Sequence, residues 1–135
     1  MSMKFLLDKN LLTKELKLNA SNRDDLCVIQ DVLDEGPFTE ADIKTIKSAG
    51  VKVLRVAKKH LEKLKDVLST HGENFKLINL YTGKGTADVM MIAFILAERD
   101  NPDTLFSDEY TIVTNDKELI SVAKSYEINS ASELN

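Results

Sequence analysis

Carboxylates stand just beyond most of the short apolar runs in this sequence. Asp8 directly follows the run at residues 5–7, and Asp116 comes two residues after a later run. Glu35 and Asp88 follow two further runs at a greater distance. Carboxylates that share a site stay ionised only when cations neutralise them, and their oxygens suit Mg²⁺ or Mn²⁺. Two such ions about 4 Å apart can activate a water and stabilise the leaving oxygen of a phosphodiester.

A purely structural interpretation of the same acids stays open. Aspartate is a favoured N-cap, and both Asp8 and Asp116 begin or nearly begin a helical pattern. Asp88, in the first turn of another helix, would complement the helix dipole. Because the chain has 22 acidic residues, some fall at such places by chance.

The elements that would position these acids alternate along the chain. Five short runs predict strands, and they are residues 3–7, 26–29, 51–56, 76–80 and 110–114. Because helical patterns separate the runs, we expect right-handed crossovers and a parallel sheet covered on both faces. The predicted fold class is α/β, three-layer α/β/α, with a central parallel sheet of about five strands. Ligands of such folds bind beyond the carboxyl ends of the strands, near a switch in strand order.

The helical patterns carry their own start and stop signals. Thr39 and Asp42 form a capping-box pattern, and Gly50 is a suitable stop for the helix that follows them. A second helix presents one apolar face, made of Ala57, Leu61, Leu64, Val67 and Leu68. Residues 89–97 are apolar all round, which predicts a central buried helix, and residues 118–124 form a last amphipathic one.

The composition is that of one ordinary globular domain over residues 1–135. Cys27 is the only cysteine, so a disulfide within the chain is excluded and a small buried hydrophobe is expected. Neither a signal peptide nor a membrane span is predicted, and we expect a cytoplasmic protein. The net charge of −4 argues against broad affinity for nucleic acid, but not against an acidic site that recruits cations.

In their order along the chain, four segments resemble the motifs of the PIN domain, the fold of VapC-type toxin ribonucleases and of several RNA-processing nucleases. They are residues 5–12, 31–35, 85–89 and 111–119. The last is the most specific, since it matches the family's apolar pair, Thr-x-Asp and helix. In the second, Asp31 and Asp34 compete with Glu35 for the position of the family's glutamate.

The resemblance implies a single PIN-like nuclease domain that cuts RNA with Mg²⁺ or Mn²⁺. The expected catalytic and metal-binding residues are Asp8, Glu35, Asp88 and Asp116. Asn10 and Thr114 would support them through hydrogen bonds. A metal-bound water would attack the phosphodiester in line, leaving a 3′-hydroxyl and a 5′-phosphate. The expected substrate-binding residues are Lys9, Lys84 and Lys117, which could also simply offset the acidic rim.

By the same resemblance, the partners are an RNA substrate, a second copy of the chain in a homodimer and, if the chain is the toxin of a toxin–antitoxin pair, an antitoxin protein. The chain departs from the family in two places. Lys84 stands where many members carry an additional acid, so a ligand for a second metal ion is missing at this position. Residues 51–68 add a strand and a helix, which weakens the toxin role relative to the fold. The alternative function is a catalytically inactive PIN-like module that binds RNA or protein.

Other chemistries fit the residues poorly. A phosphoacceptor receiver domain needs paired acids after its first strand, and a haloacid-type phosphatase needs Asp-x-Asp, where this chain has Asn10. A dinucleotide-binding enzyme needs a glycine-rich turn after the first strand, which is missing. His60 and His71 fall outside any metal-ligand spacing, and we expect neither to be catalytic.

Overall fold

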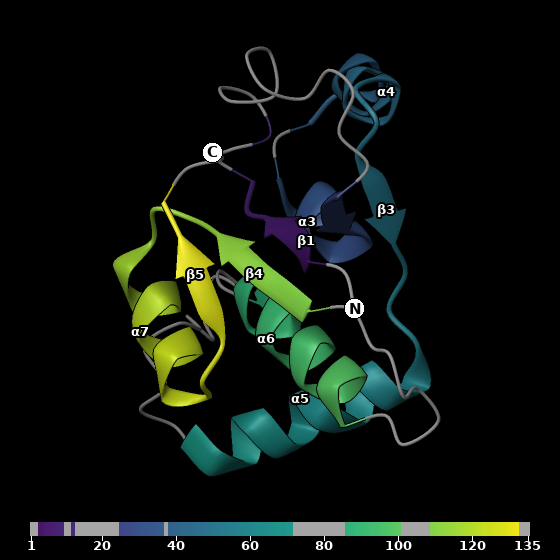
Figure 1. The fold of residues 1–135 in the computed structure, drawn as a ribbon. Helices are drawn as coiled ribbons and strands as arrows, with labels where there is room; N and C mark the ends of the chain where they lie inside the picture. The colour runs from purple at the N-terminus through teal and green to yellow at the C-terminus, as the bar shows by residue number, and fades with distance from the viewer. Residues whose placement is uncertain are drawn as a thin grey trace.

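A computed structural model describes residues 3–9, 12, 25–36, 38–71, 86–100 and 109–132. Its centre is a five-stranded sheet in the order β3-β2-β1-β4-β5, and all four neighbouring pairs are parallel (Figure 1). The strands are β1 (Met3–Leu7), β2 (Leu26–Ile29), β3 (Lys52–Leu54), β4 (Glu109–Val113) and β5 (Asn129–Ala131). The expected parallel sheet is therefore confirmed.

The order of the strands reverses direction at β1. From β1 the chain proceeds to β2 and β3 on one side, and it then returns to place β4 and β5 on the other side. β1 and β4 pair along their whole length, so that Leu7 lies opposite Val113. The residues that follow these two strands consequently leave the sheet side by side at its carboxyl edge, where folds of this class bind ligands.

Helices flank the sheet and complete a three-layer α/β/α fold. They are α3 (Gln30–Glu35), α4 (Glu40–Ser48), α5 (Lys58–His71), α6 (Thr86–Arg99) and α7 (Lys117–Ser125). In Figure 1, α5 and α6 lie against each other below the strands, α7 lies beside β5, and α4 stands at the opposite end of the molecule from α5. The right-handed crossover rule accounts for this arrangement, because the chain moves across the sheet in opposite directions before and after β3.

The local helix signals are confirmed. Thr39 Oγ accepts from the Asp42 N–H at 3.1 Å and the Asp42 carboxylate accepts from the Thr39 N–H at 2.9 Å, so both halves of the capping box form. Gly50, just past the end of α4, has φ of 92°, a value that glycine adopts without steric cost. The predicted strand at residues 76–80 lies outside the described residues. The described sheet instead gains β5, which the sequence pattern did not predict.

The core is centred on α6 and the inner strands. Every side chain from Val89 to Ala97 is buried, which confirms the central helix, and all of β2 is buried with Cys27 among its residues. A parallel strand covered on both faces has no solvent side, which explains the unbroken apolar run. No helix in the described ranges is long and apolar enough to cross a membrane.

The predicted apolar face of α5 is wrong in part. Leu61 and Leu68 are 52% and 37% exposed, whereas Val67 is 2% exposed and His60, a polar residue, is 3% exposed. The helix is therefore rotated relative to the prediction, with His60 and Val67 turned toward the protein. Tertiary contacts of His60 explain the rotation.

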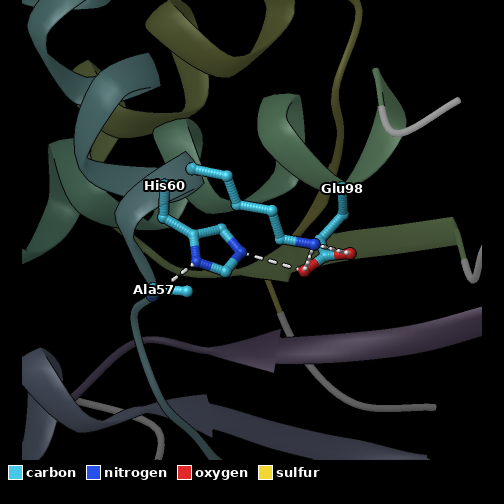
Figure 2. Close-up of polar contacts among 4 residues, drawn as sticks. Ala57, His60 and Glu98 are labelled. Carbon is cyan, nitrogen blue, oxygen red and sulfur yellow. Dashed lines mark hydrogen bonds and ion pairs between the residues drawn. The ribbon is translucent and has the colours of Figure 1, made fainter. Parts of the chain in front are cut away.

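His60 joins the start of α5 to α6 (Figure 2). Its Nδ1 accepts from the Ala57 N–H at 2.8 Å, so the neutral ring carries its proton on Nε2 and donates it to Glu98 Oε1 at 2.9 Å. The ring also stacks on Phe94, with 4.2 Å between centroids. His60 thus serves as the N3 half of a capping box, a place more often taken by glutamate or glutamine. In the described part of the chain, these contacts give His60 a structural position.

Replacing His60 with phenylalanine should lower the free energy of unfolding by about 1.5 kcal/mol, because the stacked ring is kept but both of its hydrogen bonds are lost. Urea denaturation measures the change. The control is Lys59→Ala, which removes an exposed partner of the same Glu98 carboxylate, 3.2 Å away, and should cost under about 0.5 kcal/mol. Equal losses in the two variants would show that the buried ring adds nothing beyond the surface ion pair.

Candidate active site

Two of the predicted acids, Asp8 and Asp116, are connected by one buried hydroxyl. Asp8, 3% exposed, leaves β1 beside Thr114, and its N–H donates to the Val113 carbonyl at 3.0 Å. Thr114 is fully buried. Its Oγ donates to Asp8 Oδ2 at 2.7 Å and accepts from the Asp116 N–H at 3.0 Å. A hydroxyl used once as donor and once as acceptor holds the two segments in a fixed relation.

β5, the strand that the sequence pattern missed, helps to hold this connection. The Thr114 N–H donates to the Ala131 carbonyl at 2.9 Å, so the backbone that follows β4 is anchored to its neighbour. Each of the two backbone segments at the site is therefore tied to the sheet by a hydrogen bond just past a strand end. Such anchoring limits the movement of the carboxylates that these segments carry.

The capping interpretation of Asp116 is confirmed. Its Oδ1 accepts from the N–H groups of Glu118 and Leu119 at 2.9 and 3.2 Å, at the start of α7. The described residues give Oδ2 of the half-buried Asp116 no hydrogen bond. The cap therefore occupies one oxygen and leaves the other available, so capping and metal binding are compatible roles for this residue.

Glu35, rather than Asp31 or Asp34, joins the other predicted acids. It is the last residue of α3, and its Oε2 accepts from the Ala87 N–H at 2.8 Å in the first turn of α6. Asp34 instead accepts from the Gln30 side chain at 2.9 Å, within α3. The pKa of Asp31 is raised by burial and then by the charges of Asp34 and Glu35. Of the three acids in the second motif, Glu35 is therefore the one that contacts the start of α6.

Asp88 lies in the first turn of α6, among the other three acids. The pKa of its carboxyl is raised from 3.8 to about 7. Burial is the largest cause and the charge of neighbouring carboxylates is the next, and those neighbours are Asp8, Asp116 and Glu35 in order of effect. Lys9 opposes the shift. Three acids from separate segments of the chain therefore each lie close enough to Asp88 to raise its pKa.

In the described part of the chain, no three His, Cys, Asp or Glu side chains lie close enough together to ligate one ion. Three of the four acids, Asp8, Glu35 and Asp116, accept hydrogen bonds from the protein instead. The donor set itself still fits Mg²⁺ or Mn²⁺, since it consists of carboxylate oxygens. A divalent cation would also remove the repulsion that raises the pKa of Asp88.

Of the remaining predicted site residues, two are exposed beside the acids and two lie outside the described residues. Lys9 is exposed next to Asp8, where its own N–H donates to Asp8 Oδ1 at 2.7 Å. Lys117 is exposed at the first position of α7. Asn10 and Lys84 lie outside the described residues. Ala87 lies in the third motif, but its contact with Glu35 was not predicted, because it is made by the backbone N–H and leaves no signal in the side chain.

Comparisons with known proteins add no assignment. No model of a known protein family matches the chain, and no curated protein sequence matches it significantly.

Proposed function

We propose that this protein is an endoribonuclease of the PIN type that depends on Mg²⁺ or Mn²⁺. The observation that carries the proposal is that Asp8, Asp116 and Glu35 each act on the pKa of Asp88. Asp8 and Asp116 follow the paired strands β1 and β4 at the carboxyl edge of the sheet, next to the switch in strand order. Such repulsion costs stability, and sites that retain it are disproportionately functional. The order of the motifs along the chain supports the same family.

A divalent cation held by carboxylates of this set would activate water and stabilise charge on a phosphodiester. The chain's own groups position that chemistry. Thr114 orients Asp8 by donating to one of its oxygens. The start of α7 holds Asp116 through Oδ1, and the start of α6 holds Glu35 through Oε2.

The charge at the rim favours a limited contact with the nucleic acid. Lys9 and Lys117 flank the acids and could each meet a substrate phosphate as a point charge. The net charge of −4 gives no broad basic face for a duplex. We therefore expect recognition of exposed single-stranded RNA, which proteins read through splayed bases.

The test is cleavage of a 5′-labelled single-stranded RNA by the full chain with Mn²⁺, with Mg²⁺ and with EDTA. We expect fragments with a 5′-phosphate on the downstream product and a 3′-hydroxyl on the upstream one, formed only with metal. A DNA oligonucleotide of the same sequence is the matched control for the substrate. Cutting that persists in EDTA, or no cutting of any RNA with either metal, would overturn the proposal, and RNA binding without cutting would then favour the inactive module.

A further inference from the structure

A second feature at the carboxyl edge of the sheet is a groove of about 460 Å³ that opens to solvent. Its lining residues are Gln30, Asp31, Asp34, Arg55 and Val56. The volume falls in the range of roughly 300–1,000 Å³ found for small-molecule sites. Short helix α3 connects the groove to the candidate active site, because Gln30 begins it and Glu35 ends it. The helix is about 9 Å long at 1.5 Å per residue, so the two sites are close neighbours.

The groove presents both acceptors and a donor. Asp34 is held by the Gln30 amide, while no hydrogen bond ties the half-buried Asp31 carboxylate to another side chain in the described ranges. Arg55, just past β3, is exposed and makes no ion pair or hydrogen bond with the described residues. Val56 adds a half-buried apolar wall. Two carboxylates repel a phosphate, so the groove is better suited to a base than to the RNA backbone.

The pattern of donors and acceptors selects among the four bases. Guanine presents two adjacent donors, N1–H and the N2 amino group, which a single carboxylate accepts together. It also presents O6 and N7, the acceptors that a guanidinium contacts with two hydrogen bonds. Adenine and uracil each place an acceptor where the carboxylate needs a donor, and cytosine offers the carboxylate only its N4 amino group.

We propose that the groove holds an unstacked guanine of single-stranded RNA, with Asp31 accepting from N1–H and the N2 amino group and Arg55 donating to O6 and N7. The choice of RNA as the ligand rests on the proposed ribonuclease function. The groove would give that ribonuclease a preference for sites near a guanosine. A guanine held beside α3 fixes which phosphodiester reaches Asp8 and Asp88. Asp31 and Arg55 are thus specificity residues that need not touch the reacting atoms.

Binding is tested apart from cleavage by titrating 5′-GMP into the ¹⁵N-labelled full chain in EDTA and following amide shifts. We expect saturable shifts at Asp31, Arg55 and Val56 with GMP, weaker ones with IMP, which lacks the N2 amino group, and none with AMP or inorganic phosphate. Asp31→Asn and Arg55→Gln should each weaken GMP binding about tenfold. The matched controls are Asp66→Asn and Lys58→Gln, which lie away from the groove on α5 and should leave GMP binding unchanged.

Cleavage is then mapped on RNAs of adenosine that carry one guanosine at successive positions. The wild type should cut at a fixed distance from the guanosine, and Asp31→Asn should lose that dependence. Equal shifts with all nucleotides or with inorganic phosphate, a preference for CMP, or cutting that ignores the guanosine would overturn the guanine site. GMP-specific shifts without cutting of any RNA would instead leave the guanine site standing and remove the nuclease.

Discussion

If the proposed function holds, replacing Asp8 with asparagine should reduce Mn²⁺-dependent RNA cleavage by about 10³-fold, because several kcal/mol of metal-based stabilisation would depend on this carboxylate. Asp8 is the most buried of the four acids and lies at the centre of the network, between Thr114 and the Lys9 N–H. Asparagine has the same shape but cannot carry the charge. Initial rates on one labelled RNA, measured for both proteins at saturating Mn²⁺, give the ratio.

Two variants separate this effect from a loss of folding. Asp116→Asn keeps an equally good cap for α7 and should show a comparable loss of activity with an unchanged thermal transition. Asp66→Asn removes a charge from the exposed face of α5 and should cleave as the wild type does. If Asp8→Asn retains more than a tenth of the wild-type rate while folded, the carboxylate does not bind the essential ion.

Replacing Asp88 with asparagine should stabilise the metal-free protein at pH 8 while abolishing cleavage. The raised pKa fixes the sign. Below pH 3.8 the carboxyl is protonated in both the folded and the unfolded chain, so it contributes no penalty. As the pH rises to about 7, the unfolded chain releases the proton and the folded chain retains it, so stability falls. Above that pH the full penalty is present, and the substitution removes it.

The size of this gain follows from the same shift. A rise of the pKa from 3.8 to about 7 corresponds to about 4 kcal/mol without screening, and we expect about 2 kcal/mol because Asp88 is partly exposed to solvent. Loss of the favourable helix-dipole position in α6 subtracts roughly 0.3–1 kcal/mol. Urea denaturation in EDTA at pH 5 and pH 8 measures the difference.

At pH 5 the gain should be only about a third of its value at pH 8, since most of the penalty has yet to develop. Added Mn²⁺ should stabilise the wild type and leave Asp88→Asn nearly unchanged. Asp66→Asn is the control for any general effect of a lost negative charge. A variant less stable than the wild type at pH 8 would mean that the dipole term outweighs the repulsion at this site.

Several features could be predicted from the sequence because their causes are local. The capping box of Thr39 and Asp42 joins residues three apart, so it forms wherever that helix starts. β2 and α6 are apolar throughout, and such segments have no stable position except the interior. Because strands alternate with helices, a parallel sheet covered by helices is the arrangement that buries the apolar faces of both.

Other features were decided only when the chain folded. β5 has the sequence Asn-Ser-Ala, with no apolar pattern, and it forms because β4 offers an edge with which it can pair. The buried face of α5 includes His60, because Ala57 and Glu98 form hydrogen bonds with both of its ring nitrogens. Neither partner is visible in the helical periodicity of α5.

The candidate site divides in the same way. The sequence by itself determined that acids follow the strands and that Thr114 stands two residues before one of them. It favoured Glu35 only through the family resemblance, with Asp31 and Asp34 in competition, because residues along one turn of helix differ mainly in the direction they face. Tertiary structure decided among them, since the start of α6 lies within hydrogen-bonding distance of Glu35 and the other two line a separate groove with Arg55. Spacing along a chain fixes the order of side chains, whereas the energy of their charges depends on distances that exist only in the folded state.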